Sequence, residues 1–355
     1  MTGSARRPVA ATTSAGSALG RYVLVRFLLI IPTVFILVTT VFVLMRATGD
    51  PITASLGGRL TPAQLAERIA AAGYDRPILV QYWDYLTDVF SGDFGTTISD
   101  NRPVTEVLAQ HGGATLELTL YAVLIAVVLG MPLGAVSAYF RDRAPDAVLR
   151  VLAILAYATP VFFAGLLLKL VFAVGLGWFP VAGRASTDAQ IEMRFSGGTT
   201  GIYLIDAALT GQWWVVQDVL THAVLPATAL GLLTAGVFLR LVRTNMIGTL
   251  GTEYVDAARS RGVSEWRLVG AHAARPALIP VITVAGMQVA MLLVGAVLTE
   301  TTFEWRGLGF QLAQYLTVRD FVAVQGIVVL MAVIVAVTNF VVDIVAALID
   351  PRVRY

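Results

Sequence analysis

The chain has 355 residues, of which 57% are hydrophobic and only 14% charged, and its formal net charge is +2. Soluble domains carry about 25% charged residues, so this composition predicts a membrane protein whose apolar surface faces lipid. The small net charge gives no reason to expect nucleic-acid binding. Cysteine is absent, which excludes disulfides, thiol catalysis and cysteine-bound zinc. The three histidines lie far apart in the sequence, so no metal site is expected: His111, His222 and His272.

Apolar runs of about 20 residues predict six transmembrane helices in an all-α fold. The first run follows a leader rich in Ser, Thr and Ala. A cleaved signal peptide is the competing interpretation of that run, and its length disfavours cleavage. The predicted spans are 24–45, 118–139, 151–174, 223–246, 278–298 and 322–348.

Arginine placement predicts the orientation of these spans. Most arginines lie before the first span, in the loop between spans two and three, between spans four and five, and at the C-terminus. Both termini are therefore expected to be cytoplasmic. The expected segments are a leader (1–22), the first transmembrane helix (23–46), an extracytoplasmic loop or cap (47–114), a transmembrane domain of five helices (115–348) and a cytoplasmic tail (349–355).

Two loops on the extracytoplasmic side are long. In the first, TPAQLAERIAAAG predicts a helix with Thr61 as its N-cap, Pro62 at its first position and Gly73 as its stop. The second, at 175–222, is rich in Gly and Thr and is predicted to be irregular.

The run EYVDAARSRGVSEWRLVGAHAARPALIP is the most polar stretch in the second half of the chain, and it separates predicted spans four and five. Gly262 is expected to end a first helix, and Ser264 to cap a second helix over 265–274. Small side chains at Ala257, Ala258 and Gly262 would let another backbone approach. One interpretation is a solvated loop that carries positive-inside charges; the other is a docking element for a soluble partner.

DAARSRG, at 256–262, resembles the EAA-x-x-x-G loop of ABC importer permeases, and the longer run is similar to the B-type subunit of the peptide/nickel subfamily. Asp256 replaces the usual Glu, Pro276 stands where Asn is usual, and Arg306 where Pro is common. The resemblance extends from about residue 22 onward, in family order, through GDP, DRPILVQYWDYL, SGDFGTTIS, TLELTL, GWFPVAG, HAVLPA and DPRVRY.

This resemblance implies the type I ABC importer transmembrane fold, with coupling helices at about 253–274 that seat in a groove of an ATPase. It also implies four kinds of partner: a homologous C-type permease, two ABC ATPase domains that carry ATP and Mg, an extracytoplasmic substrate-binding protein, and a peptide substrate. The residues expected to contact the ATPase are Glu253, Tyr254, Asp256, Ala257, Ala258, Arg259, Gly262 and Trp266.

Polar residues elsewhere are candidates for the other contacts. Glu117 and Glu300 are expected at the membrane interface, at the outer ends of their spans, with contact to the substrate or the binding protein as the alternative. Interhelical hydrogen bonding, or pairing with an arginine in the case of Asp343, is the structural alternative for the pathway candidates. The pathway or gate candidates are Thr283, Gln288, Asn339 and Asp343, and the candidates for docking the binding protein are Asp75, Gln81, Tyr82 and Asp93.

The chain is expected to carry no ATPase site of its own. A phosphate-binding P-loop requires a lysine, and the single lysine, Lys169, lies inside the third predicted span. The chain is therefore expected to be a transporter subunit without a cofactor, rather than an enzyme.

The expected function is uptake of short peptides across the bacterial inner membrane by alternating access. Nickel chelates, glutathione or an oligosaccharide are alternative substrates within the same importer class. A secondary transporter is disfavoured because the sequence shows neither internal repeats nor midplane charges. An intramembrane enzyme is disfavoured because no GxSxG-type signature is present.

Overall fold

The computed structural model describes residues 15–47, 49–197 and 200–349. Most of the predicted leader and nearly all of the predicted tail lie outside these residues. The described part is helical, with one isolated β-bridge between Thr96 and Pro103. Its elements are α1 (Ala15–Ala47), α2 (Pro51–Leu56), α3 (Pro62–Ala71), α4 (Ile78–Ser91), α5 (Val104–Tyr139), α6 (Ala144–Ala158), α7 (Val161–Leu168), η1 (Lys169–Gly175), α8 (Thr187–Phe195), α9 (Tyr203–Leu209), α10 (Trp213–Leu250), α11 (Glu253–Ser260), α12 (Glu265–Arg267), η2 (Leu268–Ala273), α13 (Ala274–Phe303), α14 (Leu308–Thr317) and α15 (Phe321–Ile349).

Five of the described helices, α1, α5, α10, α13 and α15, are long and apolar enough to cross a membrane, and a bent pair brings the number to six if it forms one span. The predicted span 151–174 falls on this bent pair instead of on one continuous helix. The two halves of the pair meet at 109°. The break falls where Pro160 lacks a backbone N–H and forces Thr159 into an extended conformation (φ −81°, ψ 125°).

The second outer loop was predicted wrongly, because it folds into two short helices instead of an irregular segment. Ser186 caps α8 by accepting a hydrogen bond from the Ala189 N–H at 3.3 Å. Apolar side chains from α8, α9 and the start of α10 form a small core of their own, made of Ala185, Ala189, Met193, Ala207, Val215 and Val219. Small and widely spaced apolar residues hid this core from the sequence pattern.

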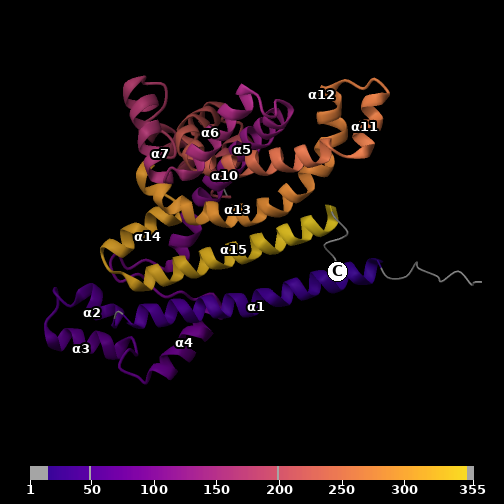
Figure 1. Cartoon of the computed structure of the whole chain (residues 1–355). Coiled ribbons are helices and arrows are strands. Elements are labelled where there is room, and N and C mark those ends of the chain that lie inside the picture. Colours follow the sequence, from indigo (N-terminus) through magenta and orange to yellow (C-terminus); the bar gives the residue numbers. More distant parts are fainter. Residues whose placement is uncertain (1–14, 48, 198–199, 350–355) are drawn as a thin grey trace, which may run out of the picture.

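The predicted helix in the first outer loop is confirmed. Thr61 and Gln64 form a reciprocal capping box at the start of α3. The helix ends at Gly73, whose φ of +72° lets the Tyr74 N–H reach the Ile69 carbonyl at 3.0 Å. With α2 and α4, this helix forms the cap of the molecule, which we define as residues 49–103 (Figure 1).

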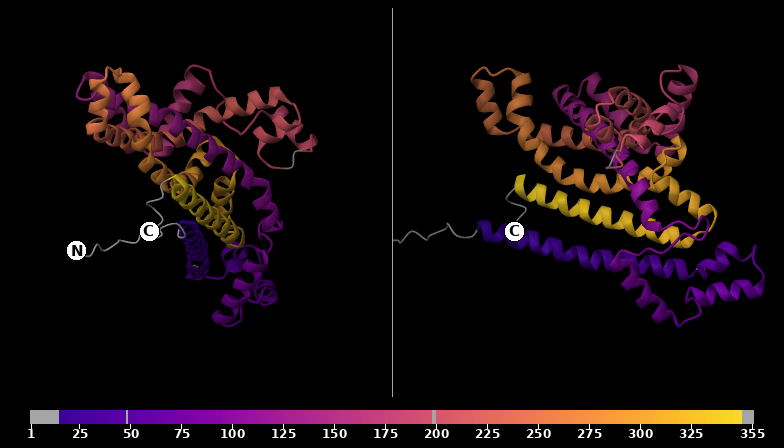
Figure 2. Two further views of the ribbon diagram at one scale, coloured as in Figure 1. Left: turned by 90° about the vertical axis from the view of Figure 1, so that its right-hand side faces the viewer. Right: turned by 180° about the vertical axis from the view of Figure 1, so that it is seen from behind.

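The transmembrane helices lie in layers, with α1 beside α15, then α13, then the pair α5 and α10 (Figure 1). The hairpin of α11 and α12 lies at the same end of the molecule as the start of α1 and the end of α15. The cap and α14 lie at the opposite end, as the rear view also shows (Figure 2). An ion pair between Arg26 and Asp343 at 3.3 Å joins α1 to α15 near the α11 end.

Close contact of α5 with α10 forms the centre of the fold. Gly130 and Gly134 on α5 face α10, and a Cβ added at either position would lie 2.7 Å from a backbone oxygen of α10. Helices in lipid associate through van der Waals packing, so glycines four residues apart permit a close approach that larger residues forbid.

We expect Gly134→Ala to destabilise the chain, although alanine favours a helix by about 1 kcal/mol over glycine. The new methyl group would clash with the Leu239 carbonyl and the Val242 side chain. Gly112→Ala on the same helix is the matched control, because a Cβ there meets nothing within 4 Å. Thermal denaturation of the detergent-solubilised chain should show a lower Tm for the first variant alone. Equal midpoints for both variants would contradict this account of the packing.

Candidate functional site

The polar insert folds as the sequence predicted around Gly262. The helix α11 ends with Gly262 in the left-handed conformation, at φ +81°. The Gly262 N–H donates to the Arg259 carbonyl at 2.9 Å, and the Val263 N–H donates to the Ala258 carbonyl at 3.3 Å. This pair of hydrogen bonds is a Schellman motif, which closes the end of α11 and turns the chain back toward α12.

Buried apolar contacts fix the orientation of α11. Val255, Ala258 and Leu268 are at most 1% exposed and form a small core with Leu250 and Val263. Ala258 therefore faces this small core, and its side chain packs beneath the exposed face of the hairpin. The remaining coupling candidates lie on the exposed face: Glu253, Tyr254, Asp256, Ala257, Arg259, Gly262 and Trp266.

Arg259 joins the two helices of the hairpin. Its guanidinium bonds Asp256 on α11 at 2.6 Å and Glu265 on α12 at 2.7 Å. The hydrogen bond from Arg259 lowers the pKa of the Glu265 carboxyl, which stays ionised at neutral pH. Trp266 is 59% exposed and stacks on Tyr139 at the end of α5, with a centroid distance of 4.4 Å. The ion pairs of Arg259 and the stacking of Trp266 on Tyr139 thus fix the conformation of the exposed face.

The second predicted helix does not end at residue 274. Ser264 has the extended backbone of an N-cap, but its side chain makes no capping hydrogen bond. From Glu265 the chain runs through α12 and the π-helical η2 directly into α13. Val269 and Ala273 of η2 pack on the C-terminal end of α10, in the cluster that includes Val242 and Met246. This packing holds the chain helical past 274, so the exposed hairpin is continuous with a transmembrane helix.

The cap residues proposed to dock a binding protein fall into two groups. Gln81 donates to the Tyr74 and Arg76 carbonyls at 2.9 and 2.6 Å, and the Tyr82 hydroxyl bonds Thr39 of α1 at 2.6 Å. Gln81 thus stabilises the cap internally, and Tyr82 attaches the cap to α1. Asp75 and Asp93 are exposed and stay available for an external contact.

The pathway candidates lie on α13 and α15, which approach closely where Gly286 meets Val342. Gln288 is half-buried and Asn339 is exposed.

The two remaining pathway candidates differ in what the structure shows of them. Asp343 forms the ion pair with Arg26, which is the structural alternative raised for it. The side chain of Thr283 lies outside the described residues.

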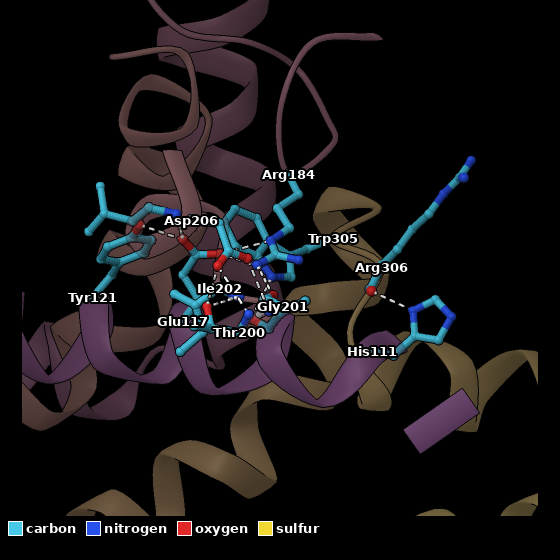
Figure 3. Close-up of polar contacts among 12 residues, drawn as sticks. His111, Glu117, Tyr121, Arg184, Thr200, Gly201, Ile202, Asp206, Trp305 and Arg306 are labelled. Atoms are coloured by element: carbon cyan, nitrogen blue, oxygen red, sulfur yellow. Dashed lines mark hydrogen bonds and ion pairs between the residues drawn. The ribbon is translucent and has the colours of Figure 1, made fainter. Parts of the chain in front are cut away.

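Glu117, which was expected at the membrane interface, is 1% exposed and ion-paired with Arg184 of the second outer loop (Figure 3). Its other oxygen accepts hydrogen bonds from the Tyr121 hydroxyl at 2.8 Å and the Leu204 N–H at 2.9 Å. Arg184 also donates to the Gly201 carbonyl at 2.7 Å and stacks over Tyr203 at 3.7 Å. The pair anchors this loop to α5.

Glu300 is likewise buried, at 0% exposure. It accepts hydrogen bonds from Thr115 of α5 at 2.6 Å and from the Phe310 N–H of α14 at 2.9 Å. Trp305 adds a bond from its indole N–H to the Ala114 carbonyl at 2.9 Å (Figure 3). The outer ends of α5, α13 and α14 are therefore tied together by polar contacts.

A third buried carboxylate, which the sequence analysis had not singled out, lies at the opposite end. Asp146 accepts bonds from Arg243 at 2.6 and 2.7 Å, from Ser137 at 2.6 Å and from the Asp142 N–H at 3.0 Å. For Glu117 and Glu300 the signal in the sequence was an acid next to an apolar run, whereas Asp146 lies among other charged residues just after α5, in the first turn of α6. No group of three or more His, Asp or Glu side chains in the described ranges is arranged to hold a metal ion.

Comparison with known proteins identifies the family. Residues 130–355 match the family described as binding-protein-dependent transport system inner membrane component, and residues 19–118 match the corresponding N-terminal family. A di/tripeptide transport system permease of Pseudomonas aeruginosa is 39% identical over 92% of this chain and 96% of its own length.

Two further relatives match at similar coverage. A dipeptide transport system permease of Escherichia coli is 37% identical over 94% of this chain and 99% of its own length. A glutathione transport system permease of Salmonella choleraesuis is 35% identical, with the same two coverages. The sequence resemblance is thereby confirmed, and the chain belongs to the family of binding-protein-dependent transport system inner membrane components.

Proposed function

We propose that this chain is the transmembrane permease subunit of an ATP-driven importer that takes up short peptides. The named substrates of its relatives support the substrate class, since di- and tripeptide permeases align with it over nearly its whole length. The observation that carries the coupling role is the hairpin of α11 and α12. It exposes a rigid polar face at one end and continues without interruption into α13.

The ATPase subunits bind ATP and Mg, and this chain contributes the contact surface that responds to them. Glu253, Asp256 and Arg259 on the exposed face supply charges of both signs, and Ala257 with Gly262 leaves room for a close backbone approach. Closure of the ATPases moves the hairpin, and α13 carries that movement into the membrane. Both termini and the hairpin are cytoplasmic in this proposal, consistent with the position of the start of α1, the end of α15 and the hairpin at one end of the molecule (Figure 1).

The proposed transport complex contains two further partners. A homologous C-type permease supplies the second half of the pathway, and α13 and α15 are the elements of this chain that contribute the candidates Thr283, Gln288 and Asn339. An extracytoplasmic binding protein delivers peptide to the cap, where Asp75 and Asp93 are exposed.

Gentle purification of the tagged chain from its native membrane tests this proposal. We expect a second six-span permease and P-loop ATPases to co-purify. Proteoliposomes of the complex should take up labelled dialanine only with both ATP and the binding protein present. Labelled glutathione in the same assay distinguishes a preference for modified tripeptides, which the third relative makes relevant. Recovery of the chain alone, under conditions that preserve known complexes, would refute the importer assignment.

A further inference from the structure

A polar cavity lies between the cap and the outer ends of two transmembrane helices. Its volume is about 180 Å³, which is about six water volumes at roughly 30 Å³ each and thus the size of an amino acid or a small dipeptide. The end of α1, the turn after α3, the helix α4 and the first turn of α15 all contribute to its wall. The polar lining residues used below are Arg46, Gln81, Asp84, Tyr85, Asp88 and Asp93.

Arg46 presents a positive charge to this cavity, with Asp50 nearby but not ion-paired with it. Its guanidinium lies 4.4 Å from the ring centroid of Tyr74 and 5.6 Å from that of Phe42, so two aromatic rings fix its position. Among the described residues it forms no ion pair and its side chain donates no hydrogen bond. A half-buried guanidinium with free donors in a fixed plane is the group that proteins use to bind a carboxylate.

Negative charge lines another part of the same cavity. Asp84 is paired with Arg76 at 3.3 Å, and one oxygen of Asp93 accepts the Gly95 N–H at 2.8 Å. The Asp88 carboxylate has no such partner within the described ranges. Burial, and then the charges of Asp93 and Asp84, raise the pKa of Asp88. An ammonium group in the cavity would relieve this repulsion.

Two buried polar atoms in the wall also lack partners. The Gln81 Oε1 and the Tyr85 hydroxyl are shielded from solvent and bond to none of the described groups. Buried polar atoms are paired in the great majority of native structures, so these two atoms are placed to form hydrogen bonds with a molecule in the cavity.

We propose that this cavity binds a small zwitterion, either a free α-amino acid or a dipeptide, with its carboxylate on Arg46 and its ammonium group toward Asp88. The Gln81 Oε1 and Tyr85 hydroxyl complete the hydrogen bonds of the ligand. The site lies in the cap, away from the hairpin and from the pathway candidates. It therefore goes beyond the proposed transport function and does not depend on it.

Because the chain contains no cysteine, one introduced cysteine gives a unique probe. Gln325 lines the cavity on α15, and Gln325→Cys places a thiol there. The rate of alkylation by N-ethylmaleimide is measured on the intact complex in membranes, without ATP or binding protein. Glycylglycine at ten times its Kd leaves about one site in ten free, so we expect about tenfold slower alkylation. Alanine in a parallel series distinguishes a free amino acid from a dipeptide.

Matched variants make the result specific to this cavity. Arg46→Gln in the same background should abolish the protection, and so should Asp88→Asn. Arg76→Gln should retain it, because Arg76 is exposed and does not line the cavity. An unchanged alkylation rate without ligand shows that each variant is folded. A thiol from Ser91→Cys, outside the cavity, should not be protected.

Two outcomes would overturn the proposal: no protection by either zwitterion at any concentration, or equal protection in Arg46→Gln. Propylamine and propionate, which each carry one of the two charges, should protect more weakly than glycylglycine. Equal protection by either of them would also overturn it. Peptide uptake is measured on the same preparations, and its loss would bear on the transport function and not on this site.

Discussion

Gly262→Asp is expected to leave the chain in the membrane and to lower coupled peptide uptake at least tenfold. No atom lies within 4 Å of a Cβ built at Gly262, so the new side chain meets open space in this chain. The carboxylate would instead enter the proposed contact with the ATPase, where an unpaired charge is strongly unfavourable once desolvated. Uptake and ATP hydrolysis in proteoliposomes measure the effect, and hydrolysis should no longer respond to the loaded binding protein.

Gly262→Asn is the matched control for this variant. Asn and Asp have nearly the same size, and both tolerate the left-handed backbone better than other residues that carry side chains. The two variants therefore share the backbone strain at φ +81° and differ in charge. We expect the Asn variant to keep most of the uptake. Equal uptake by the Asp and Asn variants would contradict the proposal that residue 262 enters a contact with the ATPase from which a charge is excluded.

Arg184→Met is expected to produce the largest loss of stability among single substitutions at the outer end. The change leaves Glu117 buried at 1% exposure without its cation, although the Tyr121 and Leu204 hydrogen bonds remain. Removal of one partner from a buried ion pair costs about 3–5 kcal/mol. Thermal unfolding of the solubilised chain should show a correspondingly lower midpoint, and limited proteolysis should cut the second outer loop faster.

Two comparisons separate this effect from a general effect of losing an arginine. Arg194→Met on the exposed face of α8 should change the midpoint little, because surface charges contribute at most about 1 kcal/mol. The double variant Glu117→Gln with Arg184→Met should recover part of the stability, since it no longer buries a lone charge. A double variant no more stable than Arg184→Met would contradict the role of the pair.

Local chemistry predicted those features of the fold that depend on a few neighbouring residues. The ends of α3 and α11 follow from Gly73 and Gly262, because glycine alone reaches the left-handed conformation without strain. The apolar runs predicted the transmembrane helices for a similar reason, since length and composition suffice to identify a segment that can cross a bilayer. The peptide/nickel subfamily was predicted from the resemblance of the quoted motifs to that subfamily, and not from local chemistry.

Long-range contacts could not be predicted from the sequence. Glu117 and Arg184 are 67 residues apart, and nothing local to either residue names the other. Only Glu117 carried an expectation, as an interfacial charge, and its pairing depends on the fold of the loop that contains Arg184, α8 and α9. The break between α6 and α7 was missed because a membrane helix often tolerates proline, so Pro160 alone did not distinguish a kink from a 109° bend.

The pairing of α1 with α15 has a consequence for how the protein is made. Arg26 emerges from the ribosome roughly 300 residues before its partner Asp343, which is about 15 to 60 s at bacterial synthesis rates of about 5–20 residues per second. Throughout that interval the first helix resides in the bilayer without the neighbour against which it finally packs. Its surface is nearly all apolar, and large side chains are exposed along most of its length, so the helix can stay in the bilayer without a protein neighbour. Truncation of the nascent chain before α15 should therefore leave α1 inserted but accessible to cross-linking with insertion factors and lipid.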